Sequence, residues 1–168
     1  MDYGTWIERV FRMSDDVWMR HANPLSGWSR LATAPFLFLA LWSWHWIGFW
    51  AFIPVGLICV WLWLNPGAFR VPVRRDAWMT RGVFGERVWL NRKAVPIPAH
   101  HARMAHVTST VAFAGLAVAV IGLVGRDFPA AALGWAIMML GKLWFIDRMV
   151  WLYEDMKGDV AEYGSWSE

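Results

Sequence analysis

The chain has 168 residues, of which 58% are hydrophobic and only 17% are charged. Soluble domains are about 45–50% apolar and about 25% charged, and a chain of this size buries only about 70% of its surface on folding. As a soluble domain it would expose too much apolar area, and its 17% aromatic content excludes a disordered chain. The single cysteine, Cys59, excludes an internal disulfide and a cysteine-based metal cluster. These numbers predict one membrane domain covering residues 1–168.

The first 20 residues mix apolar and charged side chains at close to helical spacing. Trp6, Val10 and Trp18 belong to the apolar set, with Glu8 and Asp15 between them. We expect an amphipathic helix over about residues 5–20 that lies in the membrane interface.

A charge-free run of 39 residues extends from Leu31 to Phe69. A helix crosses a bilayer with about 20 apolar residues, so this run is long enough for two crossings. We predict membrane helices over 29–46 and 48–65, with the break near His45 and Gly48. The turn-forming sequence Asn65-Pro66-Gly67 is expected to end the second helix.

A second charge-free run extends from Met104 to Gly125 and predicts a membrane helix over 106–125. After a polar turn, a fourth helix is expected over 129–147, with an extension to about residue 156. Small residues at Gly115, Ala119 and Gly122 predict close helix packing, within the chain or between subunits. The predicted fold is all-α, with four transmembrane helices in two hairpins, an N-terminal interfacial helix and a cytoplasmic loop over 66–105.

The basic residues are distributed very unevenly over this topology. Of the 16 Lys and Arg residues, Arg126 alone falls on the side of the two hairpin turns. The positive-inside rule then predicts a multi-pass protein of the bacterial inner membrane with both termini in the cytoplasm. The net charge of +3 reflects this topology and contact with anionic lipids. No nucleic-acid-binding motif accompanies it, so nucleic acid is not an expected partner.

Fifteen tryptophans are a second unusual feature of the composition. Several cluster near the predicted helix ends, where tryptophan anchors helices at the membrane interface. The alternative is that some of them line a site for a flat ligand, such as a quinone or a pigment.

Histidines and carboxylates gather on the predicted cytoplasmic side. Imidazole nitrogens and carboxylate oxygens are ligands for zinc or iron. We predict a divalent metal site formed by His21, His100, His101, Glu86 and Asp147. The candidate acid/base groups are Glu86, Asp147 and Glu154. The alternative for His100 and His101 is a polar entrance to the helix that contacts lipid phosphate.

Basic side chains in the same layer could hold an anionic substrate headgroup. The candidates are Arg87, Arg92, Arg148 and Lys142. Residues 85–92 suit a short re-entrant or interfacial helix that pairs with Asp147, Arg148 or Glu154. The alternative to headgroup recognition is that they form an ion-pair latch that fastens the loop under the helices. Lys142 could instead extend to the interface or pair with Asp147 or Glu86.

Four segments carry a resemblance to a known family: RHANPLSGWSR (20–30), WLNP (63–66), GERVWLNR with VPIPAHH (85–92 and 95–101), and GKLWFIDRMVWLYEDM (141–156). Together they resemble a family of small, Trp-rich bacterial membrane proteins that has only a domain-of-unknown-function label. The resemblance covers roughly residues 18–157. It implies the membrane architecture and no particular reaction.

Three functions remain open at this stage. The first is a membrane-embedded enzyme, metal-dependent at the His/carboxylate site, that acts on a lipid-like substrate. The second is a noncatalytic subunit or assembly factor of a larger membrane complex. The third is a transporter or channel, which with only four helices requires a homo-oligomer and has His45 as its single polar candidate in the outer half. Membrane lipids are expected partners in each case.

Overall fold

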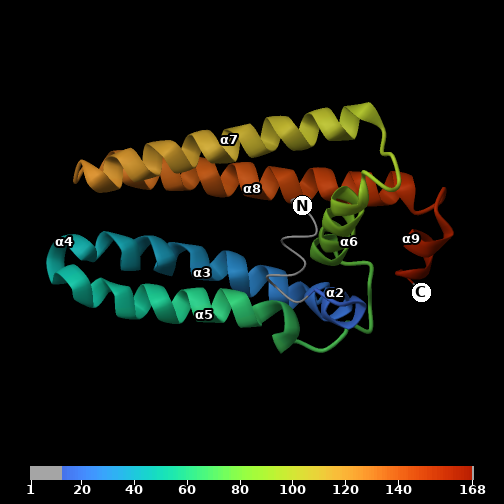
Figure 1. The fold of residues 1–168 in the computed structure, drawn as a ribbon, viewed down its shortest axis with the longest axis horizontal. Coiled ribbons are helices and arrows are strands. Elements are labelled where there is room, and N and C mark those ends of the chain that lie inside the picture. The colour runs from blue at the N-terminus through green and yellow to red at the C-terminus, as the bar shows by residue number, and fades with distance from the viewer. Residues whose placement is uncertain (1–12, 168) are drawn as a thin grey trace.

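The computed structural model describes residues 13–167, which form helices and no strand. Two long helical hairpins make up most of the molecule (Figure 1). One hairpin consists of α3 (Pro24–Trp42) and α5 (Phe52–Ala68), and the other of α7 (Ala99–Val124) and α8 (Phe128–Met156). The shorter elements are α2 (Asp15–His21), α4 (Trp44–Ile47), the 3-10 helix η1 (Gly48–Ala51), α6 (Trp78–Asn91) and α9 (Ala161–Ser165).

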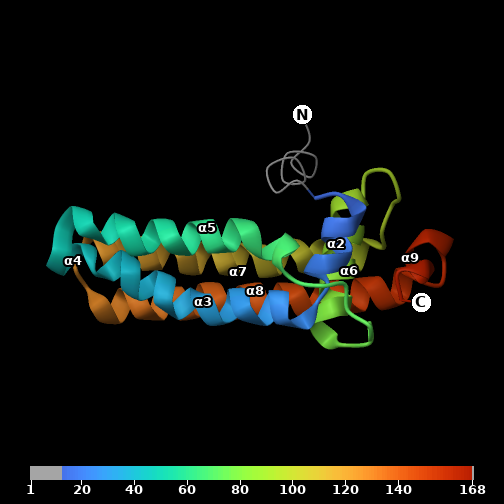
Figure 2. The same cartoon turned by 90° about the horizontal axis from the view of Figure 1, so that it is seen from below.

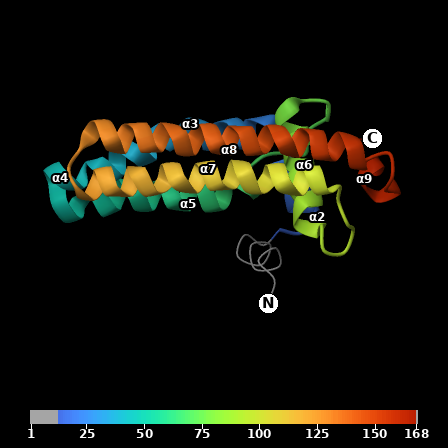
Figure 3. The same ribbon diagram turned by 90° about the horizontal axis from the view of Figure 1, so that it is seen from above.

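The hairpins stack in two layers, with α3 over α8 and α5 over α7 (Figures 2 and 3). Both hairpin turns lie at one end of the bundle, which we call the α4 end. Helices α2, α6 and α9 gather at the other, the α6 end. Three helical segments are long and apolar enough to cross a membrane: Pro24–Ala68, which contains both α3 and α5, then α7 and α8. The predicted all-helical, multi-pass architecture is confirmed.

The first hairpin begins earlier and ends later than the sequence predicts. The Asn23 side chain accepts a hydrogen bond from the Leu25 amide and caps α3, and Pro24 occupies the first helical turn, where its missing N–H costs nothing. The predicted start at residue 29 is therefore corrected to Pro24. Asn65 and Pro66 lie inside α5 rather than at its end, because Asn65 is held in a buried polar network described below.

The second hairpin also differs at its start. Helix α7 begins at Ala99, seven residues before the expected position, so His100 and His101 lie in its first turn. Helix α8 ends at Met156, close to the expected end of its extension.

Small residues bring α7 and α8 into backbone contact. A β carbon at Gly115 would collide with the backbone of Gly134 and Met138, and one at Gly122 would collide with Ala131. The predicted close packing is confirmed, and it occurs within one chain. The small-residue stripe formed by Gly115, Ala119 and Gly122 on α7 is therefore already covered by α8.

The largest correction concerns residues 66–105, which we expected to form a loop with a short interfacial helix at 85–92. The structure has a longer helix there, α6, and α6 supplies much of the buried core. Its Gly82 and Gly85 allow close approach to α8, where side chains would meet Ile146 and the backbone of Met149. The core cluster draws on α2, α6, α7, α8 and the C-terminal segment: Trp18, Ala22, Val83, Phe84, Val88, Ala105, Met149, Leu152, Tyr153, Met156, Tyr163 and Trp166.

The predicted interfacial helix over residues 5–20 lies partly outside the described residues, since these begin at Met13. Its described part is α2, whose Trp18 is buried in the protein core instead of facing lipid. At the α4 end, Trp42 packs edge-on against Phe128 with ring centroids 5.0 Å apart, and His45 Nε2 donates to the Leu123 carbonyl at 2.9 Å. The hairpins are thus joined at both ends of the bundle.

Candidate functional site

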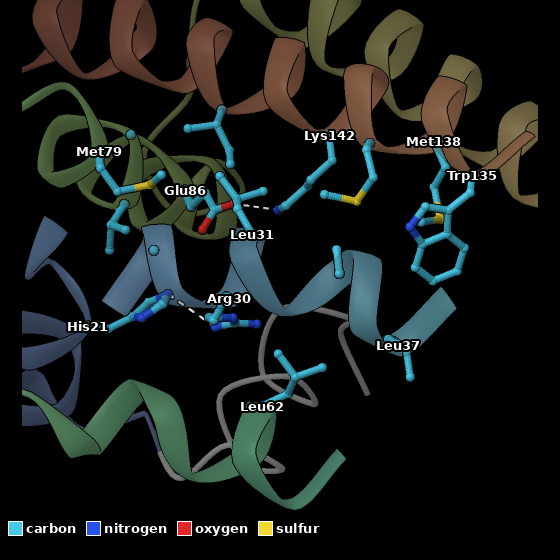
Figure 4. Close-up of a pocket in the computed structure, with 16 residues that line it drawn as sticks. His21, Arg30, Leu31, Leu37, Leu62, Met79, Glu86, Trp135, Met138 and Lys142 are labelled. Atoms are coloured by element: carbon cyan, nitrogen blue, oxygen red, sulfur yellow. Dashed lines mark hydrogen bonds and ion pairs between the residues drawn. The ribbon is translucent and has the colours of Figure 1, made fainter. Parts of the chain in front are cut away.

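A cavity of about 300 Å³ lies between the two hairpins, next to α6 (Figure 4). Its walls are mainly aliphatic and thioether side chains, with four polar residues at the end nearer α6. The polar residues are His21, Arg30, Glu86 and Lys142, and the larger apolar ones are Leu31, Leu37, Leu62, Met79, Val83, Trp135, Met138, Met139 and Ile146. The cavity is therefore amphipathic.

An ion pair joins α8 to α6 at the cavity wall. Lys142 Nζ lies 2.7 Å from Glu86 Oε1. Burial, the largest single influence, raises the pKa of the Glu86 carboxyl, but the Lys142 ammonium, with smaller contributions from His21 and Arg30, outweighs burial and holds that pKa below its ordinary value. Glu86 is therefore ionised at neutral pH.

Arg30 occupies the same end of the cavity with far fewer partners. Within residues 13–167 its guanidinium makes one hydrogen bond, to His21 Nε2 at 3.4 Å, and no carboxylate lies within ion-pair distance. A guanidinium offers five N–H donors, so the described part of the chain leaves most of its hydrogen-bonding capacity unused.

His21 belongs to a buried polar network that links α2, α3 and α5. Its Nδ1 lies 2.9 Å from Ser26 Oγ, Ser26 donates to Asn65 Oδ1 at 2.8 Å, and Asn65 Nδ2 donates to Ser29 Oγ at 2.9 Å. Burial, reinforced by the positive charge of Arg30, lowers the pKa of His21 to about 4. The ring is therefore neutral at pH 7.

The tautomer of His21 follows from its two neighbours. Arg30 can only donate, so Nε2 must be the acceptor and Nδ1 must carry the proton. Nδ1–H then donates to Ser26, whose own hydroxyl is committed to Asn65. The Ser26–His21 pair is thus a structural link and has the wrong polarity for a serine nucleophile with a histidine base.

Trp135 provides an unused donor at the opposite end of the cavity from His21 (Figure 4). Its Nε1 is buried and has no hydrogen-bond partner among the described residues. A buried donor without an acceptor costs about 1–3 kcal/mol, so this indole N–H favours a ligand with an acceptor oxygen.

The charges of the described residues at the polar end sum to one positive charge. Arg30 and Lys142 are cationic, Glu86 is anionic, and His21 is neutral. A ligand group with one negative charge would neutralise this end of the cavity.

The structure does not assemble the predicted five-residue metal site. His21 lies in the network with Ser26, and Glu86 pairs with Lys142. Asp147 accepts from Arg148 at 2.5 Å and from Trp78 Nε1 at 3.4 Å. Among residues 13–167, the only histidine and carboxylate groups close enough to share a metal are His100, His101 and Asp155.

The candidate acid/base groups are also separated. Glu86 lines the cavity, and Asp147 and Glu154 do not. Glu154 accepts from Arg81 at 3.2 Å and Lys157 at 2.5 Å, which ties α6 to the end of α8.

Of the four predicted headgroup residues, only Lys142 lines the cavity. Arg87 pairs with Asp15 and stacks over Trp166, so it acts as a latch between α6, α2 and the C-terminal segment. Arg92 donates to the Trp89 carbonyl, and Arg148 pairs with its neighbour Asp147. These three residues are engaged within the protein.

Sequence reasoning missed Arg30, Asn65 and Trp135 as residues of the site or its supports. The sequence does contain a clue to Arg30, because Arg30 is the last charged residue before a charge-free run of 39 residues. Asn65 resembled an ordinary turn residue next to Pro66, and Trp135 was one of fifteen tryptophans.

Comparison with known proteins identifies the family. No curated protein and no solved structure matches the chain. The sequence model of the family of unknown function DUF6653 matches residues 4–166, which is nearly the whole chain and confirms the resemblance in the four sequence segments. The chain therefore belongs to this family of unknown function, DUF6653.

Proposed function

We propose that the protein binds an amphiphile with a singly charged anionic headgroup, such as a phosphodiester lipid, in the cavity between its hairpins. The observation that carries the proposal is Arg30, a cation in the cavity wall whose only partner among residues 13–167 is a neutral histidine, through one long hydrogen bond. Bidentate recognition of phosphate or carboxylate is the typical use of such a guanidinium.

The remaining lining fits the rest of such a ligand. Leu37, Leu62 and Met138 line the apolar walls and suit acyl chains, and methionine adapts to irregular shapes. Trp135 lies seven residues from Lys142 on α8, which is about 10 Å along a helix. Its free indole N–H suits an ester or hydroxyl oxygen below the headgroup.

The distribution of charge supports an orientation for this site. We propose that α3, α5, α7 and α8 each cross the bacterial inner membrane and that the α6 end is cytoplasmic, because Arg126 alone of the sixteen basic residues falls in a hairpin turn. Arg30 and Lys142 then lie near the inner leaflet, where their headgroup ligands are found.

The composition of the cavity wall favours a lipid-binding function over an enzymatic one. Among the described residues that line the cavity there is no Ser, Thr, Cys or Tyr side chain, and their one carboxylate, Glu86, is paired with Lys142. The subunit hypothesis relied on the small-residue stripe, which α8 already covers. The transporter hypothesis relied on His45, which donates to the Leu123 carbonyl.

Native mass spectrometry of the detergent-purified protein tests the proposal. The protein is titrated with phosphatidylglycerol and with phosphatidylcholine of the same chain length. We expect preferential binding of about one phosphatidylglycerol per chain, reduced by roughly tenfold in Arg30→Gln. Arg74→Gln is the matched control, because Arg74 is an exposed cation of the same end and does not line the cavity. Equal binding of the two lipids, or equal loss in both variants, would refute the proposal.

A further inference from the structure

A second group of polar side chains joins the open ends of the α7–α8 hairpin. His100 and His101 lie in the first turn of α7, and Asp155 lies in the last turn of α8. His101 Nε2 is 2.7 Å from Asp155 Oδ2, and His100 Nε2 is 4.0 Å from the same oxygen. One ligand atom from each residue lies within 4.8 Å of the others.

These separations are compatible with the ligand geometry of a metal site. Zinc binds histidine nitrogens and carboxylate oxygens at about 2.0–2.2 Å, which places tetrahedral ligands about 3.3 Å apart. The two measured separations lie on either side of that value, so small side-chain rotations would equalise them. The two imidazole rings lie side by side, with centroids 4.1 Å apart, so both can face one ion.

The three side chains of this group differ in their exposure to solvent. The His101 side chain is only 6% exposed, whereas His100 is 68% and Asp155 52% exposed. A metal held here would have three protein ligands and one position open to water.

We infer that His100, His101 and Asp155 bind a divalent transition metal of the zinc type and that this metal clamps the start of α7 to the end of α8. None of the three lines the amphiphile cavity. Asp155 is thirteen residues beyond Lys142 on α8, or about 20 Å along the helix. The metal site therefore stands or falls independently of the proposed function.

Zinc itself is the probe. The full-length protein is purified in detergent, stripped with a chelator, equilibrated with low-micromolar zinc and analysed for bound metal. We expect about one zinc per chain. Affinity should fall by roughly tenfold or more in His100→Ala and in Asp155→Ala, because each removes one of three ligands.

His106→Ala is the matched control, since His106 is on the same helix and packs edge-on against Trp89, away from Asp155. Its zinc binding should be unchanged. Because His100 is exposed, His100→Ala should keep the wild-type melting temperature without metal, which separates ligand loss from misfolding. Asp155→Ala also removes the partner of the buried His101, so its metal-free melting temperature is measured beside its zinc affinity. Wild-type protein that remains metal-free would overturn the inference. So would zinc that binds equally well to Asp155→Ala, since His-only surface binding needs no carboxylate.

Discussion

Gly85 of α6 lies directly against the backbone of Met149 of α8, and a β carbon at position 85 would overlap the Met149 carbonyl group. The contact fixes how closely α6 approaches the second hairpin. It thereby positions Glu86, the next residue, opposite Lys142.

Gly85→Ala should destabilise the protein by several kcal/mol, because backbone atoms cannot move aside as a flexible side chain can. The measurement is thermal unfolding in detergent. Gly56→Ala is the control, since Gly56 is also helical and nothing lies within 4 Å of its added β carbon. A Gly85→Ala protein as stable as Gly56→Ala would contradict the observed packing.

Stability should fall as the pH is lowered through the range between the ordinary histidine pKa and that of His21. The pKa of His21 is about 4 in the folded protein and 6.5 ordinarily, so the unfolded chain takes up a proton first. The stabilisation of the folded protein that depends on a neutral His21 is complete above pH 6.5 and is lost as the pH falls toward 4. Its size is about 3 kcal/mol.

The pH effect is measured as the difference in melting temperature between pH 7 and pH 5. His21→Asn should show a smaller difference than the wild type, because it removes the titrating ring and retains a polar group. If both proteins respond equally to pH, His21 is not the group responsible.

Ser26→Ala should cost about 1–3 kcal/mol, because it leaves His21 Nδ1–H and Asn65 Oδ1 without partners in a buried site. Thr110→Ala serves as the control, since the Thr110 hydroxyl is exposed and bonds only to a carbonyl of its own helix. Chemical or thermal unfolding of both variants checks the difference. Equal stability of the two would mean that the network is not a structural support.

The Lys142–Glu86 pair should behave as a coupled unit. Lys142→Met leaves an ionised carboxylate at the cavity wall and should lower the free energy of unfolding by about 1–2 kcal/mol, less than for a fully buried pair because both side chains are partly exposed. The double variant Lys142→Met/Glu86→Gln should recover most of that loss. Additive losses in the double variant would show that the two groups do not interact.

Much of the architecture could be predicted from hydropathy and charge. The charge-free run from Leu31 to Phe69 predicted a helical hairpin, and Gly115, Ala119 and Gly122 predicted close packing. Helix α6 was predicted only in part, as a short interfacial helix at residues 85–92. Its apolar residues face the protein and its charged residues face their partners, so its mean hydropathy resembles that of a loop. Gly82 and Gly85 were its clearest signal, as two small residues on one helix face.

The site was harder to predict because its partners are distant in sequence. Pairing of Lys142 with Glu86 was one of several alternatives for Lys142, and the structure brings the two together from α8 and α6. The three other basic candidates have partners outside the cavity, as with Arg87 and Asp15 or Arg148 and Asp147. Arg30 was counted only toward the orientation, because nothing in the sequence indicates that a neutral His21 would be its one partner among the described residues.

The central claim is that an anionic amphiphile occupies the cavity, and photochemical labelling tests it most directly. A phosphatidylglycerol with a photoactivatable acyl chain is added to the detergent-purified protein, and the labelled residues are mapped by peptide mass spectrometry. We expect adducts on the cavity residues Leu37, Leu62, Met138 and Met139, suppressed by excess unlabelled phosphatidylglycerol and not by phosphatidylcholine. Labelling confined to the exposed outer residues Phe52 and Leu57 of α5, with no preference between the two lipids, would contradict the account.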